Sequence, residues 1–225
     1  MSEVDLYFLA TVVILAFITS LMARKKKDQF KESADKFISS HGFKKVNTIS
    51  SNVYKKGFNI FALDDDGQIE NILFKKVHSK DIYIFDFKYI INSGNGNSRT
   101  ASQRVVYVQL PGELLYQFEL KPEGFFDKVK QAIGFEDIDY DDYKEFSKKY
   151  ALTALNKEII ERNFPPELMK ELVNKNGVCI EARSDCILIY NNSEHQYSAY
   201  EALYKDVLTY TDILVGEKRS PEPVK

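Results

Sequence analysis

The sequence has no tryptophan, only two cysteines and only three histidines among its 225 residues. So few soft ligands argue against a structural zinc site. Cys179 and Cys186 have only His195 near them in the chain, which leaves a tetrahedral site one ligand short. The sixteen phenylalanines and fourteen tyrosines indicate instead an aromatic core, which is typical of a chain with much β-structure.

An excess of basic charge is also absent. The formal net charge is −2, and because residues 1–27 sum to +2, the remainder of the chain carries −4. A mildly acidic body lacks the clustered lysine and arginine that contact nucleic-acid phosphates. We therefore expect no nucleic-acid partner.

No motif of a familiar active site is present. The chain contains no Gly-x-Ser-x-Gly turn for a nucleophilic serine. The glycine-rich residues 93–98 lack the Gly-Lys-Ser/Thr ending of a P-loop and join two expected strands instead of opening a helix. His41, His78 and His195 are far apart in sequence, and we expect each on a surface turn. The sequence therefore predicts no catalytic, cofactor-binding or metal-binding residue and favours a protein that is not an enzyme.

Two aspartate-rich stretches depart from the calcium-binding pattern of an EF-hand loop. For residues 64–67, Asp-Asp-Asp-Gly, the first and twelfth positions of such a loop would be Ala62 and Leu73, where acidic ligands are required. The second stretch has Asp142 where the loop needs glycine. We expect a turn at the first and a solvated acidic loop at the second, with a loose divalent-ion site at residues 136–142 as the alternative.

One long apolar run stands near the N-terminus. Residues 6–23 read LYFLATVVILAFITSLMA and contain no charge. At about 1.5 Å per residue a helix of this length spans roughly 27 Å, close to the hydrocarbon thickness of a bilayer. The run is apolar on every face, unlike the helix of a soluble domain, which buries one stripe. We therefore expect a single transmembrane helix in contact with the lipid bilayer through residues 6–23.

The charges on either side of this run are asymmetric. Two acids precede it, and four cations follow it: Arg24, Lys25, Lys26 and Lys27. Basic segments that flank a membrane helix tend to remain on the cytoplasmic side. We therefore expect a single-pass protein of the inner or plasma membrane with its N-terminus outside and its C-terminal domain in the cytoplasm. The four cations are also suited to anionic lipid headgroups. A cleaved signal peptide is disfavoured, because it would begin with a basic region.

The rest of the chain predicts an α+β fold with an antiparallel sheet and peripheral helices. Helical spacing covers residues 28–40, and strand patterns follow over 53–63, 69–77, 82–91 and 104–110. The strand at 82–91 alternates aromatic and other residues, so its aromatic face should be buried. The glycine-rich segment 92–98 is then the tip of a long hairpin.

The second half of the chain alternates short helices and strands. We expect a helix from Pro122 to 134, a strand at 150–153, and helical segments that begin at Asn156 and at Pro165-Pro166. A capping box at 198–201 predicts the last helix, which ends at Gly216. The expected organisation is an anchor at 1–27, one domain at 28–215 with lobes 43–119 and 120–215, and a disordered tail at 216–225.

The two cysteines fall in a predicted hairpin at residues 178–188. Spacing alone leaves a cross-strand disulfide open. Two reduced thiols that pack as small apolar groups are the favoured interpretation, because they fit a cytosolic compartment.

Several segments of the second half together resemble a family of uncharacterised bacterial membrane-anchored proteins. The segments that carry the likeness are FELKPEGFFDK (118–128), DIDY (137–140), EFSKKY (145–150) and FPPELM (164–169). The resemblance covers roughly residues 82–190, about half of the chain. It implies a membrane anchor and a bacterial origin, and it supplies no activity.

These observations lead to two hypotheses about function. The first is a membrane-tethered interaction module that recruits a protein partner through its sheet or the hairpin tip at residues 92–98. The alternative is an unrecognised enzyme, or a ligand or divalent-ion sensor, that uses the acidic segment 136–142.

Overall fold

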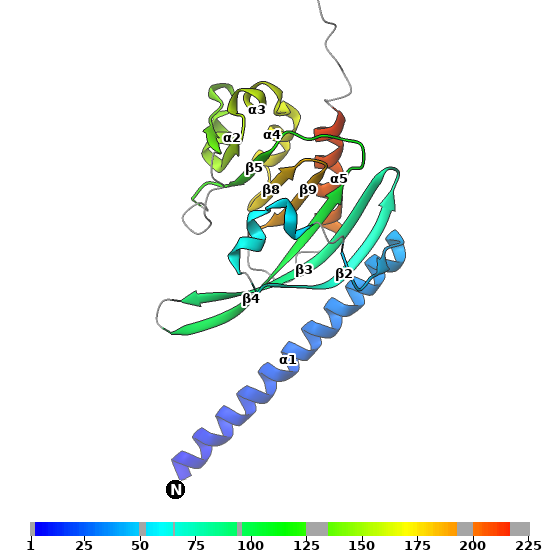
Figure 1. Cartoon of the computed structure of the whole chain (residues 1–225). Coiled ribbons are helices and arrows are strands. Elements are labelled where there is room, and N and C mark those ends of the chain that lie inside the picture. The colour runs from blue at the N-terminus through cyan, green and yellow to red at the C-terminus, as the bar shows by residue number, and fades with distance from the viewer. Residues whose placement is uncertain are drawn as a thin grey trace, which may run out of the picture. The chain divides into compact units, whose positions relative to one another are not determined.

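The computed structural model describes residues 3–49, 53–64, 66–93, 96–124, 135–192 and 200–216. The chain divides into two compact units, Met1–Gly42 and Phe43–Lys225, which we describe separately. Within its described residues the first unit is one helix, α1 (Glu3–His41), drawn in blue in Figure 1.

Helix α1 corrects the fold predicted for the N-terminus. In place of a membrane-spanning helix and a second helix from residue 28, a single helix of 39 residues runs through the basic residues 24–27. Within the described part of the chain, no helix has both the length and the apolar character that crossing a bilayer requires. The predicted transmembrane helix is therefore wrong. The physical reason is that the apolar run of residues 6–23 forms less than half of a helix whose other half is rich in charged residues.

The second unit is built on one antiparallel sheet, which in the described residues has nine strands in the order β1-β2-β3-β4-β9-β8-β5-β7-β6. The strands are β1 (Lys44–Lys45), β2 (Gln68–Val77), β3 (Lys80–Ser93), β4 (Asn97–Gln109), β5 (Phe118–Pro122), β6 (Glu136–Ile138), β7 (Tyr150–Ala154), β8 (Val178–Arg183) and β9 (Cys186–Asn191). An antiparallel sheet with helices is the α+β arrangement that the sequence predicts.

Short helices and one longer helix complete this unit (Figure 1). They are the 3-10 helices η1 (Tyr54–Lys56), η2 (Asn59–Leu63) and η4 (Asp141–Tyr143), and the α-helices α2 (Lys144–Lys149), α3 (Lys157–Asn163), α4 (Pro166–Val173) and α5 (Tyr200–Gly216). The predicted starts are confirmed at two of them. The side chain of Asn156 accepts a hydrogen bond from the backbone N–H of Ile159 at 3.1 Å, and Pro166 opens α4.

The hairpin of β3 and β4 is the longest pairing in the sheet, with a continuous register from Asp81 opposite Gln109 to Ser93 opposite Asn97. Its aromatic face is buried at Phe85 and Phe87, as predicted. The opposite face is buried as well, at Ile82 and Ile84, because this sheet is covered on both sides. Part of the predicted tip, residues 94 and 95, lies outside the described residues.

Residues 53–63 form the helices η1 and η2 instead of the predicted strand. Gly57, with φ +70°, separates the two, and a backbone in this left-handed region cannot continue a strand. The cyan turns in Figure 1 are this segment. Its apolar side chains join a core cluster on one face of the sheet: Val53, Phe58, Ile60, Ile72, Phe85, Phe87, Val105, Tyr107, Cys179, Cys186, Leu188 and Tyr190. The predicted helix at 122–134 falls largely on undescribed residues, as do Ser198 of the capping box and the tail from 217.

Candidate functional site

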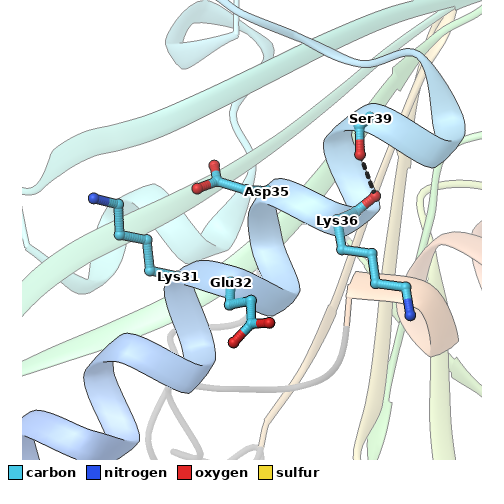
Figure 2. A pocket seen from close by; sticks show the side chains of 5 residues that line it. All are labelled: Lys31, Glu32, Asp35, Lys36 and Ser39. Atoms are coloured by element: carbon cyan, nitrogen blue, oxygen red, sulfur yellow. Dashed lines mark hydrogen bonds between the residues drawn. The ribbon is translucent and has the colours of Figure 1, made fainter.

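A shallow hollow on α1 is lined by charged side chains and Ser39. Figure 2 shows the side chains of Lys31, Glu32, Asp35 and Lys36 spreading from the helix, and Ser39 donating a hydrogen bond to the backbone carbonyl of Lys36 at 2.9 Å. Lys31 and Asp35 are oppositely charged and four residues apart, as are Glu32 and Lys36, and this spacing suits a solvated helix surface. This hollow therefore has no arrangement of groups that selects a ligand.

The acidic segment 136–142 is divided between two elements. Glu136 and Asp137 lie in β6, whereas Asp141 and Asp142 lie in η4. No cluster of three or more histidine, cysteine, aspartate or glutamate side chains able to hold a metal occurs among the residues that the structure describes. The alternative of a divalent-ion site thus gains no support from the geometry of this segment.

The predicted hairpin of the two cysteines is confirmed by β8 and β9, and both thiols are free and buried. Cys179 lies opposite Tyr190, and Cys186 lies opposite Arg183, so four residues separate the cysteines along the ladder. That offset is roughly 14 Å, about twice the Cα separation that a disulfide can bridge. Burial raises the pKa of the Cys186 thiol to about 11, so this thiol is protonated and unreactive at neutral pH.

Two histidines lie at the ends of regular elements. His78 occupies the turn between β2 and β3 with φ +54°, in agreement with the predicted surface turn. His41 is the last residue of α1, and its ring stacks on Phe37 at 4.7 Å between centroids. His195 is among the undescribed residues.

A buried network of charged side chains is the most pronounced chemical feature of the second unit. Strand β5 contributes Glu119 and Lys121, and strand β8 contributes Glu181 and Arg183. Each pair has a spacing of two, so all four side chains point to the same face of the sheet. Their exposed fractions are 1%, 0%, 0% and 6%. Two acids and two bases at one place leave no net charge to be neutralised.

Each member of this network has hydrogen-bond partners. Lys121 and Arg183 both bind Glu119, the lysine at 3.0 Å. The hydroxyl of Tyr190 donates to one oxygen of Glu181 at 3.1 Å, and the backbone N–H of Asn59 donates to the other at 2.6 Å. The side chain of Asn59 also donates to Glu119. The hydrogen bonds from Asn59 to Glu119 and Glu181 therefore hold η2 against the sheet.

The network was missed at the level of sequence, although its signal is visible there. Glu-x-Lys at 119–121 and Glu-x-Arg at 181–183 each stand within an apolar stretch. Side chains two apart share a face of a strand, so charges at this spacing in a central strand require partners across the ladder. Because every member is already bonded, the arrangement stabilises the fold and presents no reacting group. Next to it, the hydroxyl of Thr153, opposite Glu119, is buried and has no hydrogen-bond partner among the described residues.

Glu181 makes stability depend on pH. Burial raises the pKa of its carboxyl above the ordinary value of 4.5, and Lys121 opposes this shift. At a pH between the pKa of this carboxyl in the unfolded chain and its higher pKa in the folded chain, only the folded chain keeps the proton. The contribution of Glu181 to stability is therefore full below pH 4.5 and is lost as the pH rises through the pKa of the folded chain. We expect Glu181→Gln, whose amide can bond Asn59 and Tyr190, to remove this loss.

Urea unfolding at a series of pH values from 4.5 upward measures this effect. The free energy of unfolding of the native protein, taken relative to that of Glu181→Gln, should fall as the pH rises. The matched control is Glu158→Gln on the exposed side of α3, which should follow the native profile. Parallel profiles for the native protein and Glu181→Gln would show that Glu181 does not titrate differently in the two states.

An apolar groove lies on the surface beside α3. Two adjoining hollows share Leu114, Leu115, Tyr116 and Ile160. Three large apolar side chains around it are open to solvent: Leu114 is 75%, Tyr116 44% and Leu155 54% exposed. Most other large apolar side chains of this unit are buried, so their grouping here marks a surface suited to contact with another molecule.

Comparison with known proteins relates the chain to others by its fold alone. No protein-family model and no curated protein matches the sequence, which agrees with the predicted resemblance to a family without an established activity. A solved structure, that of the mycobacterial trehalose monomycolate transport factor A, TtfA, is similar with a TM-score of 0.61 at 10% sequence identity. The similarity covers 87% of this chain and 98% of that one. The two proteins therefore share a fold.

Proposed function

We propose that this protein is a non-catalytic interaction module that attaches to a lipid bilayer through α1 and recruits a protein partner through the unit Phe43–Lys225. The observation that supports the proposal most directly is the exposed apolar surface of α1. Between 45% and 73% of each of these side chains is exposed: Tyr7, Val12, Val13, Ile14, Leu15, Phe17, Ile18, Leu21 and Met22.

A lipid surface matches this part of α1 in both polarity and charge. Contiguous apolar surface of this extent is rare on a monomer in water and favours a bilayer or another protein as its cover. Arg24 and Lys25 follow directly and are exposed. Cations next to an apolar helical surface are attracted to anionic lipid headgroups. This attraction favours a bilayer over another protein as the binding partner of the apolar surface.

The apolar groove supports recruitment of a protein partner. Its floor includes the buried side chains of Leu115, Ile160 and Phe164, and its rim has Arg162 among apolar residues. An apolar centre with a cationic rim is the usual composition of a protein-binding surface. The similar fold of TtfA, which is named as a transport factor, agrees with an accessory role of this kind.

Flotation of the full-length protein with lipid vesicles tests the proposal. We expect the native protein to float with vesicles of phosphatidylcholine and more tightly when phosphatidylglycerol is added. Changing Arg24, Lys25, Lys26 and Lys27 together to glutamine should remove the preference for the anionic vesicles. Each cation near such a surface contributes about 1 kcal/mol, or about fivefold in affinity.

Two further variants make this experiment specific. Val13→Asp combined with Phe17→Asp should abolish binding to both kinds of vesicle, since it places charges on the apolar surface. The matched control changes four exposed lysines of the other unit to glutamine: Lys55, Lys144, Lys148 and Lys170. This control should float as the native protein does. If the native protein remains at the bottom of the gradient with both lipids, the attachment to a bilayer is wrong.

A further inference from the structure

The apolar groove beside α3 has two walls. One wall is α3 itself, which contributes Asn156, Ile159, Ile160 and Asn163. These residues follow the first of them by three, four and seven positions, so they share one face of the helix. The other wall is the irregular segment 114–117, which connects β4 to β5.

Main-chain bonds and buried aromatic rings hold these walls in place. The backbone N–H of Leu115 donates to the carbonyl of Ser184 in the turn between β8 and β9, at 2.6 Å. Phe118 and Phe164 line the larger hollow, are buried, and pack edge-on at 5.3 Å between ring centroids. The groove is therefore formed before a ligand binds, as small-molecule sites usually are.

The groove is also open to solvent. Leu114 is 75% and Leu155 is 54% exposed, so a ligand can contact both side chains. The larger hollow has a volume of about 590 Å³, within the roughly 300–1,000 Å³ of ligand pockets. A small molecule with a long apolar part can therefore enter the groove and bury that part.

A single cation lies in one half of the groove. Arg162 lines the larger hollow, and it is the one charged side chain among the described residues that line either hollow. It is exposed, and within the described part of the chain no carboxylate pairs with it. The smaller hollow has apolar side chains with the neutral Gln117, Asn156 and Ser184. The groove thus combines one positive charge with an uncharged, mostly apolar length.

We propose that this groove binds a single-chain amphiphile with one carboxylate, of which a fatty acid is the simplest example. The carboxylate pairs with the guanidinium of Arg162, and the chain runs along α3 past Ile159 toward the smaller hollow. The inference goes beyond the proposed function, because it adds a small-molecule ligand. An amphiphile bound there occupies the surface that would meet the protein partner, so its binding would control recruitment.

The distribution of charge and polarity favours this ligand over other amphiphiles. A guanidinium donates two parallel hydrogen bonds to a carboxylate, and one cation balances one anion. A neutral headgroup leaves Arg162 without an anion, and a cationic headgroup is repelled by it. Each methylene group that enters the groove should strengthen binding about fourfold. Since Arg162 is exposed, its charge should add about fivefold.

Photolabelling tests the inference and reports where the ligand lies, which matters because the apolar surface of α1 also attracts amphiphiles. Full-length protein is irradiated with decanoate that carries a diazirine at the end of its chain, below the concentration at which micelles form. Mass spectrometry of peptides then separates label on α1 from label in the groove. We expect label in residues 114–117 and 155–160. Unlabelled decanoate should displace it about fivefold better than uncharged decanol.

Three variants make the test specific. In Arg162→Gln, decanoate and decanol should displace the groove label equally well. Lys148→Gln, which removes an exposed cation of α2 outside the groove, is the matched control and should keep the native preference for decanoate. Leu114→Asp should remove the groove label and leave the label on α1. The three side chains are exposed, so these changes spare the core.

Two results for the native protein would overturn the inference. One is a label confined to α1, and the other is equal displacement of the groove label by decanoate and decanol. A preference for decanoate that survives in Arg162→Gln would also overturn it, because another group would then bind the carboxylate. Octanoate, which is two methylene groups shorter, should compete about fifteenfold more weakly than decanoate, and equal competition would show that the chain lies outside the groove.

Discussion

Replacing Glu119 with alanine is expected to lower the free energy of unfolding by about 3–5 kcal/mol. Lys121 and Arg183 both bind this carboxylate, and the three side chains are almost completely buried. Without Glu119, the two cations stay in the core with one carboxylate fewer, and Asn59 loses the partner of its side chain. Glu181, 3.8 Å from Arg183, is too distant to replace the missing bonds.

Urea unfolding at neutral pH measures this loss as a shift of the midpoint. Glu158→Ala, on the exposed side of α3, is the matched control and should change stability by no more than about 0.5 kcal/mol. The double variant Glu119→Ala, Lys121→Ala should cost less than the sum of the two single variants, since the pair is removed together. A loss below about 1 kcal/mol for Glu119→Ala would show that water enters and solvates the cations.

Replacing Phe87 with alanine is expected to cost about 3–5 kcal/mol, the usual range for a large aromatic side chain in a closed core. Phe87 is completely buried and packs edge-on against Phe61 of η2 at 5.2 Å between ring centroids. It also stacks on Tyr89 at 5.7 Å. A Cβ added at Gly67 would clash with its ring, so the turn before β2 is fitted closely around Phe87.

Thermal or urea unfolding measures the loss, and Phe87→Leu is the graded control because it keeps most of the volume. The fit around Gly67 adds a sharper expectation. Gly67→Ala should destabilise the native protein through its clash with the ring, and it should cost less in the Phe87→Ala background, where the backbone carbonyl of Asp64, 3.0 Å from the added Cβ, is the close contact that remains. Equal costs of Gly67→Ala in the two backgrounds would contradict this packing.

Elements with a strong local signal were predicted well from the sequence. The hairpin of β3 and β4 follows from alternation, and the starts of α3 and α4 follow from Asn156 and the proline pair. Residues 53–63 were mistaken for a strand because apolar side chains on both sides of a short segment do not distinguish a strand from two 3-10 turns. Hydrogen bonds from Asn59 to Glu119 and Glu181 hold this segment in place. Glu119 is 60 positions from Asn59 in the sequence, and Glu181 is 122 positions from it.

The candidate sites depended even more on long-range pairing. The buried network needs β5 beside β8. This neighbour cannot be deduced from local patterns. For α1, the sequence predicted the apolar run but not the continuation of the helix into the charged residues. The basic residues 24–27 were interpreted as a boundary, although lysine and arginine are good helix formers.

The order of the strands also determines when this protein can fold during synthesis. Strands β8 and β9 are the last two to be made, yet they lie at the centre of the sheet between β4 and β5. Until residue 191 has left the ribosome, the two halves of the sheet have no common neighbour, and Val106, Val108 and Leu120 remain in contact with water. Folding of the sheet is thus postponed to the end of translation, and during this interval the strands already made expose apolar side chains that favour aggregation.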